Sequence, residues 1–180
     1  MFSSIDFSDL FNQRFYQNFL PIPASNNLNL GEMTPHFSLP DITNKCNVKL
    51  SDYWDKQPVL LALTRIFTAK QYCPLCLPHI KALNQNYERF LDRGVEVLLI
   101  TSTDKQQSRH VINNFGLNLP LLSDPQCITF KAYGVGQALG APLPGQFLLD
   151  REGKLRFKHI FSFLSPHADV NALIDAVDGL

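Results

Sequence analysis

Apolar residues follow two different spacings along this chain, and each spacing predicts a different element. Continuous apolar runs at 58–65 and 95–101 are typical of β-strands that are buried on both faces. Between them, from Pro74 to about Arg93, apolar residues recur every three or four positions, which predicts a helix ending at Gly94. Strand, helix and strand therefore follow one another in a βαβ order.

The same analysis places the remaining elements of the body. Short strands are predicted at 37–41, 48–50, 119–122, 146–150 and 155–160, and helices at 104–115, 126–133 and 167–178. Residues 151–154 form the turn of a hairpin, in which Gly153 is expected to take a positive φ. Strands interleaved with helices predict an α/β domain whose central sheet is covered on both faces.

The N-terminal segment has a pattern of its own. Phenylalanine and leucine recur at helical spacing over about 3–19, with Ser4 or Ser8 as the capping residue, and a proline-containing connector over 21–29 follows. Such an apolar stripe must bury against something. Packing on its own domain and contact with a second copy of the chain in a homodimer both stay open, while the shortage of Lys and Arg argues against a membrane surface.

Length and charge restrict the class of protein. The chain has 180 residues, 45% hydrophobic and 18% charged, which is typical of one globular domain. We expect a helical arm and linker over 1–30 and the main domain over 31–180. Sixteen basic residues balance sixteen acidic ones, so nothing predicts nucleic-acid binding. The absence of a long apolar run and of a signal-peptide pattern predicts a cytoplasmic protein without a membrane partner.

The strongest chemical signal is the dithiol Cys73-Pro74-Leu75-Cys76, which follows a buried strand and opens the predicted helix. The positive end of a helix dipole stabilises a thiolate at this position. Pro74 is expected at the first helical position, where its fixed φ is favourable. The three-residue separation puts both sulfurs on one face, so that one thiol can attack a substrate and the other can resolve the product.

Other roles for the two cysteines make different demands on the sequence. A zinc site needs two more ligands, and Cys46, Cys127, His36 and His79 are all isolated. A c-type haem needs histidine where Leu77 stands. We therefore expect no metal and no cofactor. Two buried structural cysteines without reactivity remain an alternative.

Several residues near the dithiol are candidates for tuning it. Arg65 ends the preceding strand and could pair with a thiolate, and Lys70 could lower the pKa of the attacking thiol. Tyr72 directly precedes Cys73 and could shield it. His79 lies one helical turn beyond the dithiol and could transfer protons. Each also has an ordinary structural explanation, as a solvated charge or a packing residue.

A series of short motifs resembles the redoxin group, which includes the alkyl hydroperoxide reductase and thiol-specific antioxidant proteins. In order they are Phe37-Ser-Leu-Pro-Asp, Val59–Arg65, Cys73-Pro-Leu-Cys76, Gly94–Thr101, Ser123-Asp-Pro, Tyr133-Gly-Val and Phe147–Gly153. The match covers roughly residues 31–175 and is nearest to peroxiredoxin-like proteins that carry a C-x-x-C. It implies a thioredoxin-like fold, with a mixed sheet flanked by helices and an N-terminal helical extension.

The chain also departs from the peroxiredoxin pattern Pro-x-x-x-Thr-x-x-Cys. Aligned on Cys76, the Thr position holds Cys73 and the Pro position holds Ala69. Aligned on Cys73, these positions hold Lys70 and Ile66. Neither alignment supplies the hydroxyl group that would hold a peroxide oxygen. The resemblance therefore implies the fold more strongly than it implies peroxidase activity.

A second departure lies before the later strand. Where that family has Arg-x-Thr-Phe, this chain has Pro144-Gly-Gln-Phe147. Thioredoxin-like oxidoreductases place a cis proline at this point, facing the dithiol. The resemblance therefore implies a cis peptide bond between Leu143 and Pro144.

Together these features predict an enzyme, a thiol-disulfide oxidoreductase acting on a disulfide substrate. Cys73 would attack, Cys76 would resolve, and an external thioredoxin- or glutathione-like thiol would restore the dithiol. The supporting residues are Arg65, Tyr72, Pro74 and Pro144. Two alternatives stay open: a hydroperoxide-reducing peroxidase in which Cys76 becomes the sulfenic acid, and a redox-sensing module without turnover.

Overall fold

The computed structural model describes residues 10–25 and 27–180. Its elements are α1 (Gln13–Gln17), β1 (Ser38–Asp41), β2 (Cys46–Lys49), η1 (Leu50–Tyr53), β3 (Val59–Thr64), α2 (Cys76–Gln85), α3 (Tyr87–Leu91), β4 (Glu96–Thr101), α4 (Lys105–Phe115), β5 (Leu121–Ser123), α5 (Ile128–Ala132), β6 (Gln137–Ala138), β7 (Ala141–Pro142), β8 (Gly145–Leu149), β9 (Leu155–Ile160) and α6 (Val170–Asp178). No helix in these two ranges is long and apolar enough to cross a membrane.

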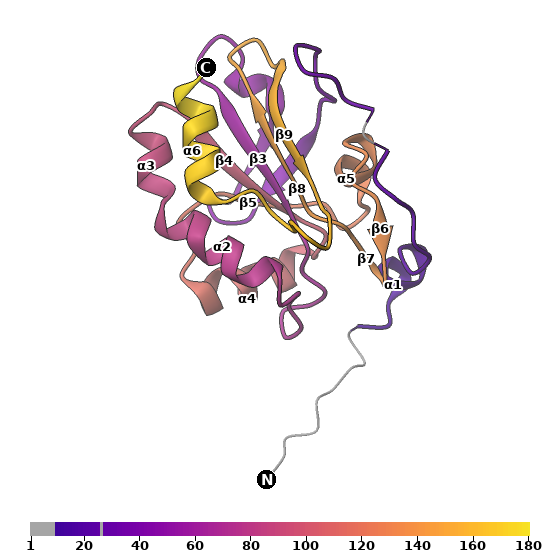
Figure 1. Cartoon of the computed structure of the whole chain (residues 1–180). Helices are drawn as coiled ribbons and strands as arrows, with labels where there is room; N and C mark the ends of the chain where they lie inside the picture. Colours follow the sequence, from indigo (N-terminus) through magenta and orange to yellow (C-terminus); the bar gives the residue numbers. More distant parts are fainter. Residues whose placement is uncertain (1–9, 26) are drawn as a thin grey trace.

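A mixed seven-stranded sheet forms the centre of the molecule, in the order β2-β1-β5-β4-β3-β8-β9. The parallel unit β3-β4-β5 is the product of the βαβ order, and β8 joins β3 antiparallel on its other side. In Figure 1, α2, α3 and α6 lie on one side of the sheet and α5 lies on the opposite side. The predicted α/β class with a thioredoxin-like mixed sheet is confirmed.

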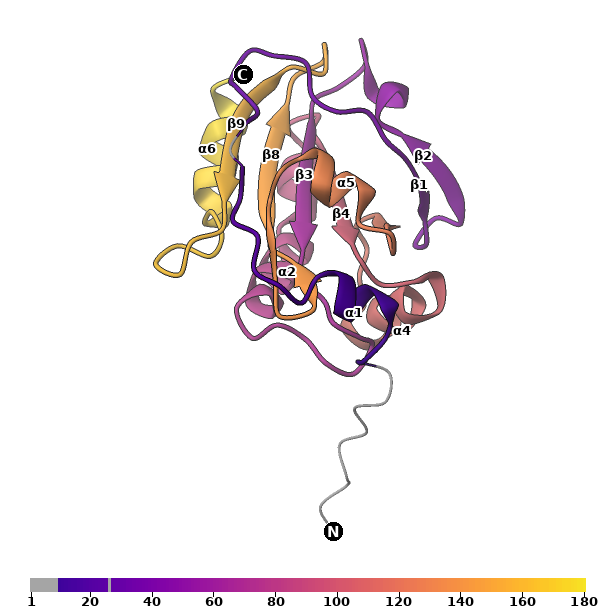
Figure 2. The ribbon, with the colours of Figure 1, turned by 90° about the vertical axis from the view of Figure 1, so that its right-hand side faces the viewer.

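Two apolar cores cover the two faces of the sheet. Because successive strand residues point to opposite faces, Leu60 and Ala62 pack under α2, α3, α4 and α6. Leu61 and Leu63 point the other way, into a core closed by α5 and the β1–β2 hairpin. Figure 2 shows α5 lying across β8, β3 and β4 on that second face. Burial on both faces explains why the sequence of β3 is a continuous apolar run rather than an alternation of apolar and polar residues.

The helix after the dithiol differs from the prediction in two ways. It is divided into α2 and α3 around Asn86, whose backbone N–H donates to Ala82 at 3.1 Å and Leu83 at 3.2 Å. It also starts at Cys76 rather than at Pro74. The physical reason is Pro78, which has no N–H to donate to the carbonyl of Pro74, so the regular ladder begins two residues later.

The predicted helix over 3–19 is confirmed only in its last part, α1. Asn12 caps it by accepting a hydrogen bond from the N–H of Phe15 at 3.0 Å. The two predicted caps, Ser4 and Ser8, lie outside the described residues. The connector that follows pairs with the main domain through Ile22 and Gln137, so the described part of the arm packs on its own chain.

The small hairpin β6–β7 was not predicted, and three glycines, at 134, 136 and 140, lie in it or just before it. The structure gives these glycines a packing role. A Cβ on Gly136 would lie 2.5 Å from the carbonyl oxygen of Ile22, and one on Gly140 would lie 2.0 Å from Phe15. The missing side chains therefore let the arm approach the hairpin closely, as Figure 1 shows for α1 beside β6 and β7.

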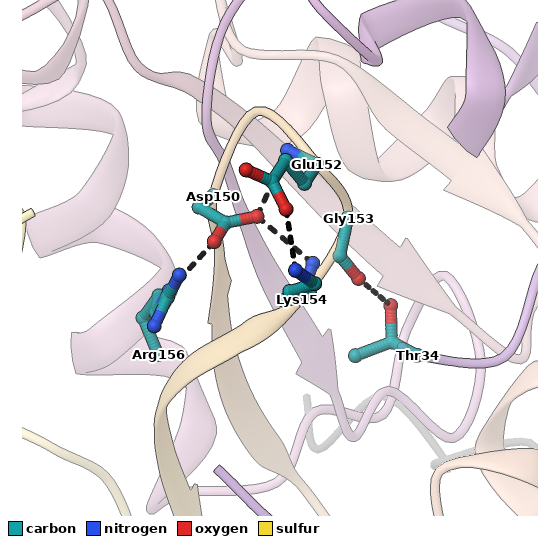
Figure 3. Close-up of polar contacts among 6 residues, drawn as sticks. All are labelled: Thr34, Asp150, Glu152, Gly153, Lys154 and Arg156. Carbon is teal, nitrogen blue, oxygen red and sulfur yellow. Dashed lines mark hydrogen bonds and ion pairs between the residues drawn. The ribbon is translucent and has the colours of Figure 1, made fainter. Parts of the chain in front are cut away.

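The turn between β8 and β9 has the predicted conformation, with Gly153 at φ 79°. Asp150 accepts hydrogen bonds from the N–H groups of Glu152 and Lys154, both at 2.9 Å, and from Arg156 Nε at 2.6 Å (Figure 3). Thr34 donates to the carbonyl of Gly153 at 3.1 Å. One carboxylate thus fixes the turn, and Thr34, near the start of the main domain, is tied to it.

The contact between the arm and the hairpin can be tested with two glycines of similar φ. Gly136 has φ 80° and contacts the arm, while Gly31 has φ 85° and has nothing within 4 Å of an added Cβ. Alanine at either position costs about 1–2 kcal/mol because of the positive φ. We expect Gly136→Ala to lose about 1–3 kcal/mol more than Gly31→Ala, because it also displaces the arm. Urea unfolding measures both losses, and equal losses would contradict the close packing of the arm.

Candidate active site

The dithiol lies in the segment that joins β3 to α2, at the carboxyl end of the parallel strands. This segment folds back on itself through an antiparallel bridge between Ile66 and Tyr72. The carbonyl of Cys73 then accepts hydrogen bonds from the N–H groups of Cys76 and Leu77, both at 3.1 Å, so Cys73 precedes the first helical turn. The two cysteines are free and near each other.

The two thiols have different environments. Cys73 is half-buried, whereas Cys76 is 1% exposed and belongs to the core under α2. The pKa of Cys73 is lowered to about 6, chiefly because the Cys76 thiol hydrogen-bonds to its sulfur and also because the N–H groups of Cys76 and Leu75 and the charge of Arg65 stabilise the thiolate. The same thiol–thiol hydrogen bond, together with burial, raises the pKa of Cys76. At neutral pH the accessible sulfur is therefore the thiolate, and the buried one keeps its proton.

Arg65 lies beside the dithiol, as its position at the end of the strand suggested. Its guanidinium is buried and donates to the carbonyl of Ala138 at 2.5 Å, in the small hairpin, and lies 4.8 Å from the ring centre of Phe67. Its charge lowers the pKa of both cysteines. The hairpin and the ring thus hold a cation next to the thiolate.

Two of the other predicted supporting residues border the thiols. Tyr72 donates through its hydroxyl to the carbonyl of Ala69 at 2.5 Å and packs edge-on against Phe115, with ring centres 4.8 Å apart. Pro74 and Leu75 are exposed between the cysteines and form the outer rim.

The predicted cis bond before Pro144 is wrong, because no peptide bond in the described residues is cis. An X–Pro bond favours trans by about 0.5–1 kcal/mol. With this bond in the trans form, the backbone connects β7 to β8, and the N–H of Leu143 donates to the carbonyl of Gly136 at 3.0 Å. Since Gly145 pairs with Leu63, the buried Pro144 still directly precedes β8, near the end of β3.

A pair of stacked histidines lies on the inner side of the dithiol helix. His79 stacks on His167 with ring centres 4.3 Å apart and planes 9° from parallel, and His167 Nδ1 is 3.1 Å from the buried amide of Gln146. Burial, and then the facing imidazole, lower the pKa of His79 to about 3. Burial lowers the pKa of His167 to about 4. Both rings are therefore neutral near pH 7. Nothing in the spacing of the sequence indicated His167.

The remaining cysteines lie apart from the dithiol. Cys127 is buried in the core on the opposite face of the sheet from Cys76, so it is not placed to resolve a disulfide there. Cys46 is exposed in β2. Within 10–25 and 27–180, no three His, Cys, Asp or Glu side chains are grouped to hold a metal ion.

A mixed sheet with a dithiol at the start of a helix defines the class of thioredoxin-fold redox proteins. A protein-family model described as AhpC/TSA matches residues 30–158. The chain therefore belongs to the AhpC/TSA family, which confirms the resemblance found in the motifs. Curated relatives in this family are thiol-disulfide oxidoreductases and peroxiredoxins, and this chain is an oxidoreductase of the same thiol chemistry.

Two relatives illustrate the two branches. The chain is 30% identical over 128 residues to thiol-disulfide oxidoreductase ResA of Geobacillus thermodenitrificans, covering 71% of this chain and 67% of the relative. It is 29% identical over 154 residues to peroxiredoxin Bcp of Escherichia coli K12, covering 81% and 94%. The crystal structure of peroxidoxin BcpB from Mycobacterium tuberculosis superposes with a TM-score of 0.73 at 19% identity, covering 86% of this chain and 99% of that one, which shows a common fold.

The charge of Arg65 can be tested by the pH dependence of alkylation. Iodoacetamide reacts with thiolate, so the rate at Cys73 should rise through pH 6 and level off above it. Removing the guanidinium in Arg65→Ala takes away a stabilising charge, and we expect the midpoint to move up by about one unit. Arg109→Ala, which removes an exposed arginine from α4, is the comparison and should leave the midpoint in place. A midpoint unchanged in Arg65→Ala would show that the guanidinium does not act on the thiolate.

Proposed function

We propose that this protein is a thiol-disulfide oxidoreductase in which Cys73 attacks the substrate and Cys76 resolves the mixed disulfide. The observation that carries the proposal is the asymmetry of the dithiol. The accessible Cys73 has its pKa lowered to about 6, while burial and the thiol–thiol hydrogen bond raise the pKa of Cys76. A nucleophile must be both ionised and reachable, and only Cys73 satisfies both conditions.

The reaction begins when the Cys73 thiolate attacks one sulfur of a substrate disulfide. The substrate S–S bond breaks, one substrate sulfur leaves as a thiolate, and a mixed disulfide forms with Cys73. Cys76 then loses its proton and attacks Cys73 Sγ, which releases the second substrate thiolate. The substrate gains two electrons, and the protein ends with a Cys73–Cys76 disulfide that an external thiol donor reduces.

The second step is helped by the first. Three causes raise the pKa of Cys76: in order of size, its hydrogen bond to Cys73, its burial, and the charge of the Cys73 thiolate. Formation of the mixed disulfide removes that thiolate, and with it the first and third of these causes. Arg65, which lowers the pKa of Cys76, stays in place. The resolving thiol therefore becomes more acidic when it is needed.

A peroxidase is the second candidate, because several relatives are named peroxiredoxins. In that mechanism one cysteine takes an oxygen atom from a hydroperoxide to form a sulfenic acid, and the other condenses with it and releases water. Cys76 occupies the family's peroxide-attacking position but is buried and its pKa is raised. These properties, and the missing Thr at the third position before it, support the disulfide reaction instead.

The partners follow from this chemistry. We propose an external thiol donor, thioredoxin- or glutathione-like, which suits a reducing cytoplasm. A homodimer through the arm also stays a proposal. Arg14 and Phe15 are buried against the same chain, whereas Phe11 and Tyr16 are exposed and would be the residues that a second copy contacts.

The order of the two cysteines can be tested by trapping. Cys76→Ser leaves Cys73 able to attack but removes the resolving thiol, so mixed disulfides with a model disulfide, such as 5,5′-dithiobis(2-nitrobenzoate)-activated glutathione, should accumulate. Cys73→Ser should form about tenfold less mixed disulfide, because its remaining thiol, Cys76, is buried and protonated. Intact-mass analysis measures both adducts, and Cys46→Ser in each background excludes labelling at that exposed thiol.

Hydrogen peroxide consumption separates the alternatives. We expect the reduced protein to react with peroxide no faster than free cysteine when the two rates are compared per thiolate, while it reduces disulfides with turnover. A fast peroxide reaction that Cys76→Ser abolishes would reverse the order and establish the peroxidase. A dithiol that turns over with neither substrate would leave the redox-sensing module.

A further inference from the structure

A buried arginine of the arm reaches the segment that carries the dithiol. Arg14, in α1, is 7% exposed. Its Nη1 donates to the carbonyl of Ser102 at 2.9 Å and to the hydroxyl of the same residue at 3.2 Å, with the carbonyl of Ile66 at 3.5 Å. Its Nη2 donates to the carbonyl of Phe67. One guanidinium therefore spans the segments that follow β3 and β4, two neighbouring parallel strands.

The position of these contacts connects Arg14 to Arg65. Ile66 and Phe67 directly follow Arg65, and the ring of Phe67 lies against the Arg65 guanidinium. The far side of Arg65 is held by the carbonyl of Ala138, in β6. That hairpin in turn pairs with the arm, since the N–H of Leu139 donates to Phe19 at 3.0 Å.

These hydrogen bonds form a closed circuit of contacts. Arg14 connects the arm to the segment after β3, Arg65 connects that segment to the β6–β7 hairpin, and Leu139 connects the hairpin back to the arm. Both guanidinium groups donate to backbone carbonyls, and a planar group with five donors can hold several carbonyls in a fixed geometry. Lysine has a single ammonium on a flexible stem and cannot do the same. The circuit therefore restricts how far Arg65 can move from the dithiol.

We propose that Arg14 is a positioning residue for the redox reaction: it fixes the backbone at Ile66 and Phe67, and so holds Arg65 beside Cys73. Arg14 lies outside residues 30–158, the part of the chain that the family model matches. The arm thus supplies a component of the site, although it does not touch the sulfurs. The inference rests on the proposed role of Cys73 as the attacking thiolate.

A second property distinguishes this role from simple packing. Burial lowers the pKa of Arg14, so placing a cation here is unfavourable unless hydrogen bonds compensate for the lost water, and both Nη groups make them while the buried Nε does not. An apolar side chain could fill the same space without that cost. The charge and the multiple donors therefore serve the geometry of the backbone at the ends of β3 and β4.

The experiment is the pH profile of iodoacetamide alkylation at Cys73 in the full-length Arg14→Ala protein. We expect the midpoint to rise by roughly half a unit to one unit, because a mobile Arg65 stabilises the thiolate less. Arg109→Ala, which removes an exposed arginine from α4, is the matched control and should not move the midpoint. Circular dichroism and urea unfolding establish that each variant is folded.

Coupling between the two arginines gives the second measurement. If Arg14 acts through Arg65, the midpoint in the double variant Arg14→Ala/Arg65→Ala should match that of Arg65→Ala alone. Additive shifts would overturn the proposal, as would an unchanged midpoint in folded Arg14→Ala. If Arg14→Ala does not fold, Arg14→Lys takes its place, since it keeps the charge and loses the bridging geometry, and an unchanged midpoint there also overturns the proposal.

Mass mapping separates this inference from the proposed function. If the fast-alkylating residue is Cys73 and only the effect of Arg14 is missing, the positioning role fails and the order of the thiols stands. If the fast-alkylating residue in the wild-type protein is Cys76, the proposed function itself fails. The two results are therefore distinguishable in one data set.

Discussion

The chemistry that we propose for this protein depends on one proton held between two sulfur atoms. The hydrogen bond from Cys76 to Cys73 lowers the pKa of one thiol and raises that of the other, which makes a symmetrical pair of residues unequal. Burial of Cys76 under the core of the sheet fixes the direction of the asymmetry, because the exposed sulfur carries the charge at lower desolvation cost. The remaining features of the site, including Arg65, adjust this arrangement rather than create it.

Most of the fold was predictable because its central strands are defined by local patterns. The apolar runs that became β3 and β4, the capping Asp104 of α4, and Gly116 at its end are all readable from short stretches of sequence. The dithiol was predictable for the same reason, since its spacing and its place before a helix are local. The early start assigned to that helix was an avoidable error: Pro78 already indicated that the first carbonyl of the helix lacked a donor.

What could not be predicted is held together by contacts between distant segments. His167 meets His79 only because α6 packs against α2, and the glycines of the β6–β7 hairpin gain their meaning from an arm more than a hundred residues earlier. The trans bond before Pro144 likewise follows from the path between two strands and not from the residue itself. Such features leave no periodic pattern in the sequence. The expectation of a cis bond before Pro144 came from the family resemblance alone, and this chain does not follow it.

The circuit around Arg65 also affects the order in which the protein acquires its activity. Its hydrogen bonds join residues 52, 73 and 88 positions apart, and the amide of Gln137 reaches the arm across 120 positions. Contacts of such long range form late, after the local strands and helices have appeared. During synthesis the dithiol leaves the ribosome long before the hairpin that completes its surroundings. A nascent chain therefore carries its dithiol without the cation beside it, and Arg65 is held in place only as the last third of the sequence folds onto the first.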